Sequence, residues 1–324
     1  PDGAVVVEGD SILEVGERKA LAARYPDAEC IDAHGGVIMP GLINAHTHIY
    51  SGLARGLSIP GNNLTNFLEI LEGTWWNIDR HLTLDMTRAS AYATLLECIR
   101  NGVTTIFDHH ASFCEIPGSL TEIAKVTEEM GIRACLCYEV SDRDGEEKCL
   151  QGIRENARRL NAAFAWNKGF KEYFAVKATP NPYILQVLKE EGCGCDCASY
   201  TELLMAQAVG NTGHDVMFSS NVTPEKDMRK AYEMGAYINL DDATHVEFLA
   251  RICDGKVPET VCLRFNPGGS FSLGNTIMDM PRDAKYGMTE DQMAGAINRL
   301  QKLGVKHFGI HAFLASNTTA NGYY

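Results

Sequence analysis

Short apolar runs alternate with longer amphipathic stretches along most of the chain. Two early runs lie in residues 4–15 and 36–43, and Gly9-Asp10 interrupts the first as a hairpin turn does, which predicts a small N-terminal β-hairpin piece. The later runs are separated by stretches with helical spacing. Such alternation predicts an α/β fold with a parallel sheet of the (β/α) barrel type. The predicted later strands are Thr104–Asp108, Ile132–Tyr138, Tyr173–Lys177, Gly194–Ala198, Val216–Ser219, Ala236–Leu240, Val261–Asn266 and His307–Phe313.

Several of the intervening helices have recognisable starts. A serine or threonine followed three residues later by glutamate or glutamine forms a capping box, in which each side chain satisfies a free backbone N–H of the first turn. We therefore expect helices to begin at the pairs Ser119 and Glu122, Ser199 and Glu202, and Thr289 and Gln292.

Composition narrows the classes of function. The net charge of −13 over 324 residues argues against a nucleic-acid partner, because phosphate binding needs a basic surface. No stretch has the roughly 18 apolar residues of a membrane span. The eleven cysteines, without an export signal, predict reduced thiols. A cytoplasmic protein that acts on small molecules, with neither nucleic acid nor membrane as a partner, is therefore expected.

Three of the cysteines, Cys193, Cys195 and Cys197, alternate along one predicted strand. Alternate strand residues share a face, whereas zinc sites usually leave two residues between cysteines. Cysteine is also among the residue types most often buried. The pattern therefore favours buried thiols over a metal site.

His46 and His48 are candidate metal ligands. They are separated by one residue at the end of an apolar run, so their imidazoles point the same way and can converge on one ion. A Pro-Gly turn ahead of them, at Pro40-Gly41, suits a site at the C-terminal mouth of a barrel strand. A His-x-His pair by itself is weak evidence, because catalytic zinc normally has three protein ligands.

The string from Val37 to His48 resembles the first barrel strand of the amidohydrolase superfamily, in its aminohydrolase and cytosine-deaminase-like branch, and the resemblance continues through residues 102–110. It implies a small β-sandwich over residues 1–36, a half barrel over residues 37–150, and metal-dependent hydrolysis or deamination at C–N bonds.

By this resemblance His46 and His48 would bind a divalent metal such as zinc. His110 would face the substrate, with a packed or surface histidine as the equal alternative. The later histidines lie in no string that matches the family's later strands: His214, His245, His307 and His311.

Lys177 ends the apolar run Tyr173–Lys177. A lysine at a strand end can lose part of its hydration, which lowers its pKa and makes it an imine-forming nucleophile. The plainer alternative is a strand-end lysine that reaches solvent.

Residues 151–324 resemble the barrel domain of the pyridoxal phosphate (PLP)-dependent decarboxylases related to diaminopimelate and ornithine decarboxylase. The motifs that carry this resemblance follow one another in order: 173–178, 195–202, 263–268, 285–287 and 309–317. The resemblance implies a homodimer with an amino-acid substrate. It also implies that Lys177 holds PLP as a Schiff base. By the same resemblance Asp196 and Glu202 would line the cofactor pocket, Arg264 would be a charged group around it, and Ser316 would help to hold the phosphate.

This second resemblance has two departures. Phe313 stands where relatives commonly place a histidine that stacks on the pyridine ring. The family's glycine-rich phosphate loop, the acidic partner of the ring nitrogen and the C-terminal β-domain would follow Tyr324, so full decarboxylase activity is not expected of the residues given.

The two resemblances meet near residue 150, where Leu150, Ile153, Ala157 and Leu160 keep helical spacing through the junction. The leading hypothesis is a PLP-binding, decarboxylase-like segment fused to a truncated amidohydrolase. The alternatives are a metal-dependent hydrolase or deaminase, and a non-catalytic hybrid. Three barrel-type strands before the junction and about six after it also raise the hypothesis of one hybrid barrel from two sources.

Overall fold

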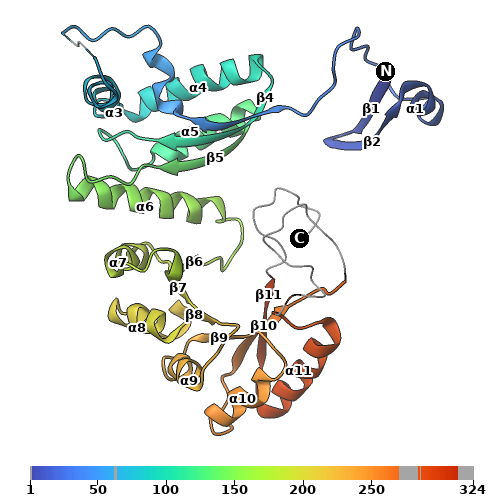
Figure 1. Ribbon diagram of the computed structural model, residues 1–324, viewed down its shortest axis with the longest axis vertical. Coiled ribbons are helices and arrows are strands. Elements are labelled where there is room, and N and C mark those ends of the chain that lie inside the picture. The colour runs from blue at the N-terminus through green and yellow to red at the C-terminus, as the bar shows by residue number, and fades with distance from the viewer. Residues whose placement is uncertain (1, 62–63, 270–283, 285, 313–324) are drawn as a thin grey trace. The chain divides into compact units, whose positions relative to one another are not determined.

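The computed structural model describes residues 2–61, 64–269, 284 and 286–312 (Figure 1). The chain divides into two compact units. The first unit comprises residues 1–110 and 122–137, and the second comprises residues 111–121 and 138–324. Within the described residues, helices long and apolar enough to cross a membrane are absent.

The first unit begins with the predicted hairpin. Strands β1 (Gly3–Glu8) and β2 (Ser11–Glu17) pair antiparallel, and Gly9 takes a positive φ of 60° in the turn between them. Helix α1 (Arg18–Arg24) follows and buries Leu21.

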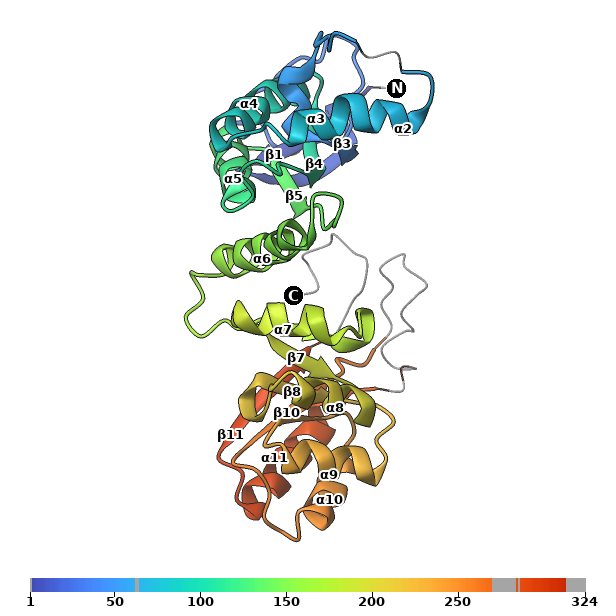
Figure 2. The same ribbon diagram turned by 90° about the vertical axis from the view of Figure 1, so that its left-hand side faces the viewer.

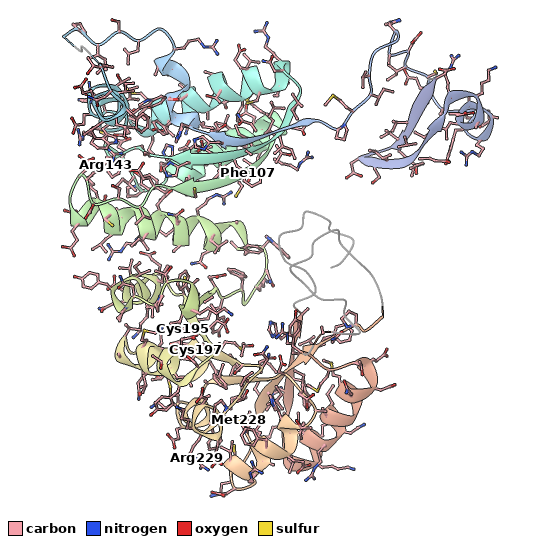
Figure 3. All side chains as sticks on the ribbon, in the orientation of Figure 1. Phe107, Arg143, Cys195, Cys197, Met228 and Arg229 are labelled. Atoms are coloured by element: carbon pink, nitrogen blue, oxygen red, sulfur yellow. The ribbon has the colours of Figure 1, made fainter. Side chains whose placement is uncertain are left out.

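A second sheet of the first unit carries the predicted histidine pair. It contains β3 (Leu42–Thr47), β4 (Val103–His110) and β5 (Arg133–Tyr138) in that order, with β3 parallel to β4. Its core contains Ile106 of β4 and residues of α4 (Leu84–Arg100) and α5 (Ser119–Met130). On the other face Phe107, labelled in Figure 3, is 43% exposed. Short helical segments connect β3 to α4: η1 (Ile49–Ala54), α2 (Phe67–Ile70), η2 (Leu71–Trp75) and α3 (Trp76–Asp79).

The strand predicted at residues 36–43 begins later than expected. Residues 37–41 are not in a strand, and β3 starts at Leu42. Pro40 has no backbone N–H to donate to a neighbouring strand. Gly41 lies so close to Thr104 that an added Cβ would stand 2.2 Å from the threonine Cγ2, so only glycine fits there.

The second unit contains a six-stranded sheet in the order β11-β10-β9-β8-β7-β6, and every pair of neighbours is parallel (Figure 1). These strands agree with the predicted runs to within one or two residues at each end. Strand β6 ends at Ala175, so Val176 and Lys177 of the predicted run lie in a 3-10 turn, and Phe313 lies outside the described residues. The strands are β6 (Tyr173–Ala175), β7 (Gly194–Cys197), β8 (Val216–Ser219), β9 (Tyr237–Leu240), β10 (Thr260–Phe265) and β11 (His307–Ala312).

Helices alternate with these strands, as the pattern of the sequence predicts (Figure 2). The capping box predicted at Thr289 is present at the start of α11. At the start of α8 only half of the predicted box is present: the Ser199 side chain accepts a hydrogen bond from Glu202 N, but the Glu202 carboxylate accepts one from Ala198 N instead of Ser199 N. The helices are α6 (Glu146–Ala163), α7 (Pro182–Glu190), α8 (Tyr200–Ala208), α9 (Glu225–Glu233), α10 (His245–Ile252) and α11 (Glu290–Leu303), with short 3-10 turns η3 (Val176–Ala178) and η4 (Gly213–Asp215).

The two faces of the six-stranded sheet differ in character. One face forms the apolar core with the helices, through residues such as Phe218, Ile238 and Leu263. Cys195 and Cys197, labelled in Figure 3, are buried in the same core, and Cys193 beside them is buried too, as predicted. Because strand residues alternate between faces, the neighbours of these core residues lie on the opposite face.

The sheet of the second unit is strongly curved. Ser219 Oγ on β8 lies 3.4 Å from His311 Nδ1 on β11, although β9 and β10 lie between their strands. In a flat sheet those two strands would be about 14 Å apart, at roughly 4.8 Å per step. Among the described residues β6 and β11 are not paired with each other, so the sheet is an incomplete barrel.

The strands on either side of the junction do not combine into one sheet. In the described part of the chain, β3, β4 and β5 form their own sheet and their own core, separate from those of β6 to β11. The hypothesis of a single barrel stitched from all these strands is therefore wrong. The hypothesis gave the correct number of strands on each side of the junction, but the number of strands does not determine which strands pair.

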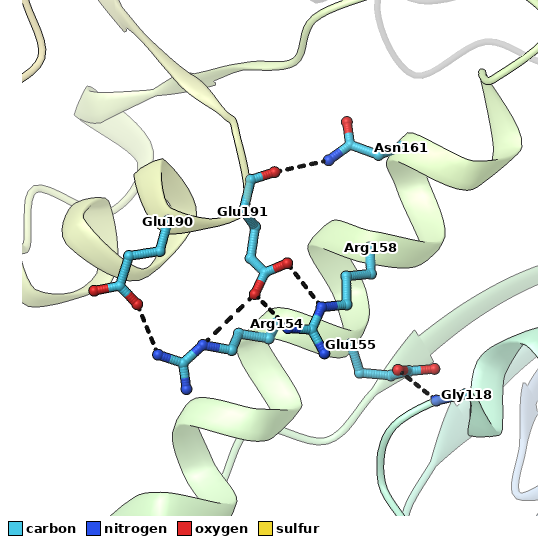
Figure 4. A network of polar contacts seen from close by, with 7 residues as sticks. All are labelled: Gly118, Arg154, Glu155, Arg158, Asn161, Glu190 and Glu191. Carbon is cyan, nitrogen blue, oxygen red and sulfur yellow. Dashed lines mark hydrogen bonds and ion pairs between the residues drawn. The ribbon is translucent and has the colours of Figure 1, made fainter.

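Helix α6 carries the junction without a break, as its spacing predicts. On one side, both carboxylate oxygens of Glu155 accept backbone hydrogen bonds, from Gly118 N at 2.8 Å and Leu120 N at 3.0 Å. On the other side, ion pairs tie α6 to the end of α7, with N–O distances of 2.7 Å for Arg154–Glu190 and Arg158–Glu191 (Figure 4).

The capping box predicted at Ser119 is replaced by this distant carboxylate. Helix α5 does begin at Ser119, but Glu122 points to Arg88 and Lys125 and forms ion pairs with both. Glu155 instead satisfies the backbone N–H groups at the helix start, where the helix dipole favours a negative charge. Local sequence located the helix start, but the group that caps it is a tertiary contact.

We predict that Glu155→Ala lowers the free energy of unfolding by about 1–3 kcal/mol, because buried N–H groups lose their acceptor. Denaturant unfolding followed by circular dichroism measures this change. Glu147→Ala, at an exposed position on the same helix, is the matched control and should stay within about 0.5 kcal/mol of the wild type. Equal losses in the two variants would contradict the capping role.

Candidate functional site

Lys177 lies just beyond the carboxyl end of β6. The strand ends at Ala175, and the 3-10 turn η3 follows with Val176 buried and Lys177 exposed. The turn thus holds the lysine backbone in the fold while its side chain reaches outward. Within the part of the chain that the structure describes, the Lys177 ammonium has no hydrogen bond or ion pair, so the amine is available to a ligand.

Asp196 lies on the neighbouring strand, where Ala175 pairs in register with it. Burial raises the pKa of the Asp196 carboxyl to about 6, the positive charge of Lys177 lowers it, and the negative charge of Glu202 raises it. Because Ala175 and Asp196 are register partners and Lys177 lies in the turn that follows β6 directly, Lys177 and Asp196 both lie near the carboxyl ends of these two strands.

Glu202 is engaged at the start of α8. Its carboxylate accepts hydrogen bonds from Ala198 N at 2.8 Å and Ser199 Oγ at 3.0 Å. Glu202 therefore acts on Asp196 through its charge, while its oxygens serve the helix cap. Its predicted place in the cofactor pocket stays a prediction.

Arg264 on β10 belongs to the same face of the sheet. Its NH1 atom forms an ion pair with Asp241 Oδ1 at 2.9 Å, and both side chains are largely buried. The guanidinium also lies over the Tyr286 ring, 4.3 Å from the ring centroid. The pairing with Asp241 was not predicted from the sequence, which offered Arg264 without a partner.

A polar network that the sequence analysis missed completes this face. Asn239 Nδ2 on β9 lies 2.9 Å from Ser219 Oγ and 2.8 Å from His311 Nδ1. Burial lowers the pKa of His311, the charges of Arg264 and Lys177 lower it further, and Asp241 opposes them. The sequence did contain a signal for Ser219, Asn239 and His311. They alternate with core residues along their strands, and this alternation places them on the face opposite the helices.

The predicted site residues thus divide into three groups. Lys177, Asp196 and Arg264 lie at the carboxyl ends of three strands of one parallel sheet, where ligands of such sheets bind. Strands β6 and β7 are neighbours, and β8 and β9 lie between β7 and β10. Glu202 lies one turn into the helix that follows. Ser316 and Phe313 lie outside the described residues.

The donor set of this face fits PLP, an anionic aldehyde. An aldehyde forms a Schiff base with an amine that no protein group occupies, as the amine of Lys177 is among the described residues. Arg264 and His311 can donate N–H groups to anionic oxygens. Asn239 is 3% exposed, and its Oδ1 atom is buried without a hydrogen-bond partner among the described residues. An unsatisfied buried acceptor is costly, which is typical of a site built for something other than stability.

The histidine pair of the first unit converges as predicted. The Nε2 atoms of His46 and His48 lie 3.2 Å apart, and His48 Nδ1 lies 3.0 Å from the carbonyl oxygen of His109. Two nitrogens bound to one tetrahedral zinc at about 2.0–2.1 Å would be roughly 3.3 Å apart. The geometry therefore fits two ligands of one metal ion. The described residues hold no group of three or more candidate ligands around a common point.

Two buried residues of β4, Asp108 and His110, lie close in sequence to His109, whose carbonyl oxygen contacts His48. Asp108 Oδ1 accepts a hydrogen bond from Ile49 N at 2.7 Å, which fixes the turn after His48, and burial raises the pKa of Asp108 to about 7. His110 is fully buried, its ring lies 5.7 Å from that of Tyr50, and burial lowers its pKa to about 3. Of the two alternatives for His110, the structure therefore supports a packed, neutral histidine.

Comparison with known proteins gives two family matches that overlap along the chain. Residues 37–192 match the amidohydrolase family, and residues 3–28 match an imidazolonepropionase-like composite domain of bacteria. The 5'-deoxyadenosine deaminase of Methanosarcina barkeri is 33% identical over 161 residues, which are 50% of this chain and 34% of that protein.

The later residues match a different group of proteins. The diaminopimelate decarboxylase of Thermoplasma acidophilum is 30% identical over 166 residues, 51% of this chain and 39% of that protein. The crystal structure of diaminopimelate decarboxylase from M. jannaschii with L-lysine aligns with a TM-score of 0.47 at 23% identity, and the alignment covers 52% of this chain and 42% of that one. The chain thus spans between about a third and two fifths of the length of the two curated relatives.

The family match to residues 150–324 covers more than half of the chain, and it contains the face with Lys177, Asp196 and Arg264. It overlaps the amidohydrolase match between residues 150 and 192, where α6 and α7 lie. Through residues 150–324, the chain belongs to the family of the pyridoxal-dependent decarboxylases, of which it contains the pyridoxal binding domain.

Proposed function

We propose that the second unit binds PLP covalently through Lys177 and is the cofactor-binding segment of an amino-acid decarboxylase, which needs further residues of that family for full activity. The observation that carries this proposal is the exposed amine of Lys177, unpartnered among the described residues, on a face shared with Asp196 and Arg264. We further propose that the chain consists of the predicted segments 1–36, 37–150 and 151–324, and that the protein forms the predicted homodimer.

Lys177, Asp196 and Arg264 have different roles in this proposal. PLP, when bound, supplies an electron sink for the carbanion that remains after CO₂ leaves. Lys177 provides the amine that anchors the aldehyde carbon. Asp196, with its pKa near neutrality, accepts or returns a proton beside that amine. Arg264, fixed by Asp241, offers N–H groups to an anionic oxygen.

We predict that adding PLP to the purified chain produces an absorption band that free PLP lacks and that borohydride bleaches. Lys177→Ala should abolish this band, because no other described lysine occupies the carboxyl end of β6. Lys168→Ala, at an exposed position before the same strand, should keep it. Peptide mapping after reduction locates the label, and a label on any lysine other than Lys177 would contradict the proposal.

We also predict that Asp196 titrates near pH 6 and that Lys177→Gln raises its pKa, because a positive charge beside the carboxylate is lost. Carbon-13 NMR of the aspartate carboxyl measures this pKa, with Lys168→Gln as the unchanged control. Since the folded-state pKa lies above the ordinary value of about 3.9, the protonated carboxyl favours folding. Its contribution is complete below about pH 4 and is lost as pH rises through about 6, and Asp196→Asn should remove this dependence.

The second candidate function is metal-dependent hydrolysis or deamination at a C–N bond in the first unit. The convergence of the His46 and His48 Nε2 atoms at 3.2 Å is the observation that favours it. A metal held there would act as a Lewis acid or lower the pKa of a bound water.

For this second candidate we expect cobalt(II) to bind with a visible absorption spectrum that His46→Ala and His48→Ala each remove. Two imidazole ligands predict a weak and exchangeable site. His34→Ala is the matched control, since His34 is exposed in the same unit and stands away from the pair in sequence. Binding that survives in His46→Ala and His48→Ala would reject the assignment.

A further inference from the structure

The network of Ser219, Asn239 and His311 joins three strands of the curved sheet, β8, β9 and β11 (Figure 1). Asn239 is its centre, because its amide nitrogen lies within 2.9 Å of both partners. Its side chain is almost completely buried, so it cannot exchange these partners for water.

The donors and acceptors of this network determine where the proton of His311 lies. An amide nitrogen only donates, so Asn239 Nδ2 donates one hydrogen bond to Ser219 Oγ and one to His311 Nδ1. Nδ1 of His311 is then the acceptor, and a neutral imidazole must carry its proton on Nε2. The reversed amide would leave two buried N–H donors unsatisfied instead of the single acceptor Oδ1, which costs more.

The surrounding charges keep His311 neutral. Burial and the positive charges of Arg264 and Lys177 lower its pKa, and the opposing charge of Asp241 is already paired with Arg264. A neutral ring with its proton on Nε2 has one N–H left to donate. Ser219 Oγ lies 3.4 Å from His311 Nδ1, the same nitrogen that Asn239 contacts. The Nε2 atom of His311 is therefore the one that can donate to a ligand.

We propose that Asn239 is a positioning residue that fixes His311 in the Nε2-protonated form, so that this N–H donates to an anionic oxygen of the ligand bound at Lys177. The assignment of the proton stands on the network alone. The assignment of the ligand rests on the proposed function, because it takes PLP as the molecule that brings the anionic oxygen.

The proton assignment is tested without any ligand, by long-range proton–nitrogen NMR of the ¹⁵N-histidine-labelled chain. His311→Gln identifies the resonances, and the Nε2-protonated form is expected in the wild type. Asn239→Asp has nearly the same shape but turns the donor into an acceptor, so the proton should move to Nδ1 and the pKa of His311 should rise. Asn167→Asp, at an exposed position, should change neither. A wild-type ring protonated on Nδ1 would overturn the proposal, even if Asn239→Asp fails to fold.

The ligand assignment is tested by titrating the wild type and Asn239→Asp with PLP and measuring the dissociation constant by absorbance. We expect about tenfold or more weaker binding in the variant, because a nitrogen acceptor then faces an anion. Pyridoxal, which lacks the phosphate, shows the same loss if the phenolate oxygen is the acceptor and no loss if a phosphate oxygen is.

The failures of the two proposals can be told apart. If the wild type binds PLP at Lys177 and Asn239→Asp binds it equally well, this inference fails and the proposed function stands. If the wild type binds no PLP, the proposed function and the ligand assignment fail together, while the NMR result still decides the proton position.

Discussion

The hydrogen bond between Asn239 and His311 depends on the curvature of the six-stranded sheet of the second unit, whereas Ser219 is already paired with Asn239 on the adjacent strand β8. Ser219 and His311 come from β8 and β11, which a flat sheet would keep far apart. The curvature makes one face concave, and the polar residues gather on that face at the carboxyl ends of the strands. Lys177, Asp196 and Arg264 owe their common environment to the same geometry. The candidate site is therefore a consequence of sheet curvature more than of any local motif.

Helix α6 explains how two different resemblances coexist in one folded chain. The amidohydrolase match and the decarboxylase match overlap over residues 150–192, so α6 and α7 satisfy both patterns. Glu155 caps the start of α5 from one side of α6, while Arg154 and Arg158 bind the end of α7 from the other. An amphipathic helix between strands is common to both patterns, and a junction inside such a helix disturbs neither.

The two candidate sites differ in what supports them. Near Lys177, burial and surrounding charges shift the pKa values of Asp196 and His311, and perturbed pKa values in such a place are typical of functional sites. At His46 and His48 the support is geometric, since two imidazole nitrogens converge without a further described ligand. The first site therefore carries the principal proposal, and the second remains a separate hypothesis about the first unit.

Local pattern in the sequence determined the strands, most helix starts and the position of Lys177 at a strand end, because alternation, caps and apolar runs act over a few residues. It also carried both family resemblances, through motifs that are themselves local. The strand predicted at residues 36–43 begins too early because it includes Pro40, which has no backbone N–H for a neighbouring strand. The capping box predicted at Ser119 is wrong because the group that caps α5 is distant in the chain. Only the tertiary structure brought Asn239 to His311 and Arg264 to Asp241. Those contacts join residues 72 and 23 positions apart, and their closeness depends on the pairing and curvature of strands, which no short segment encodes.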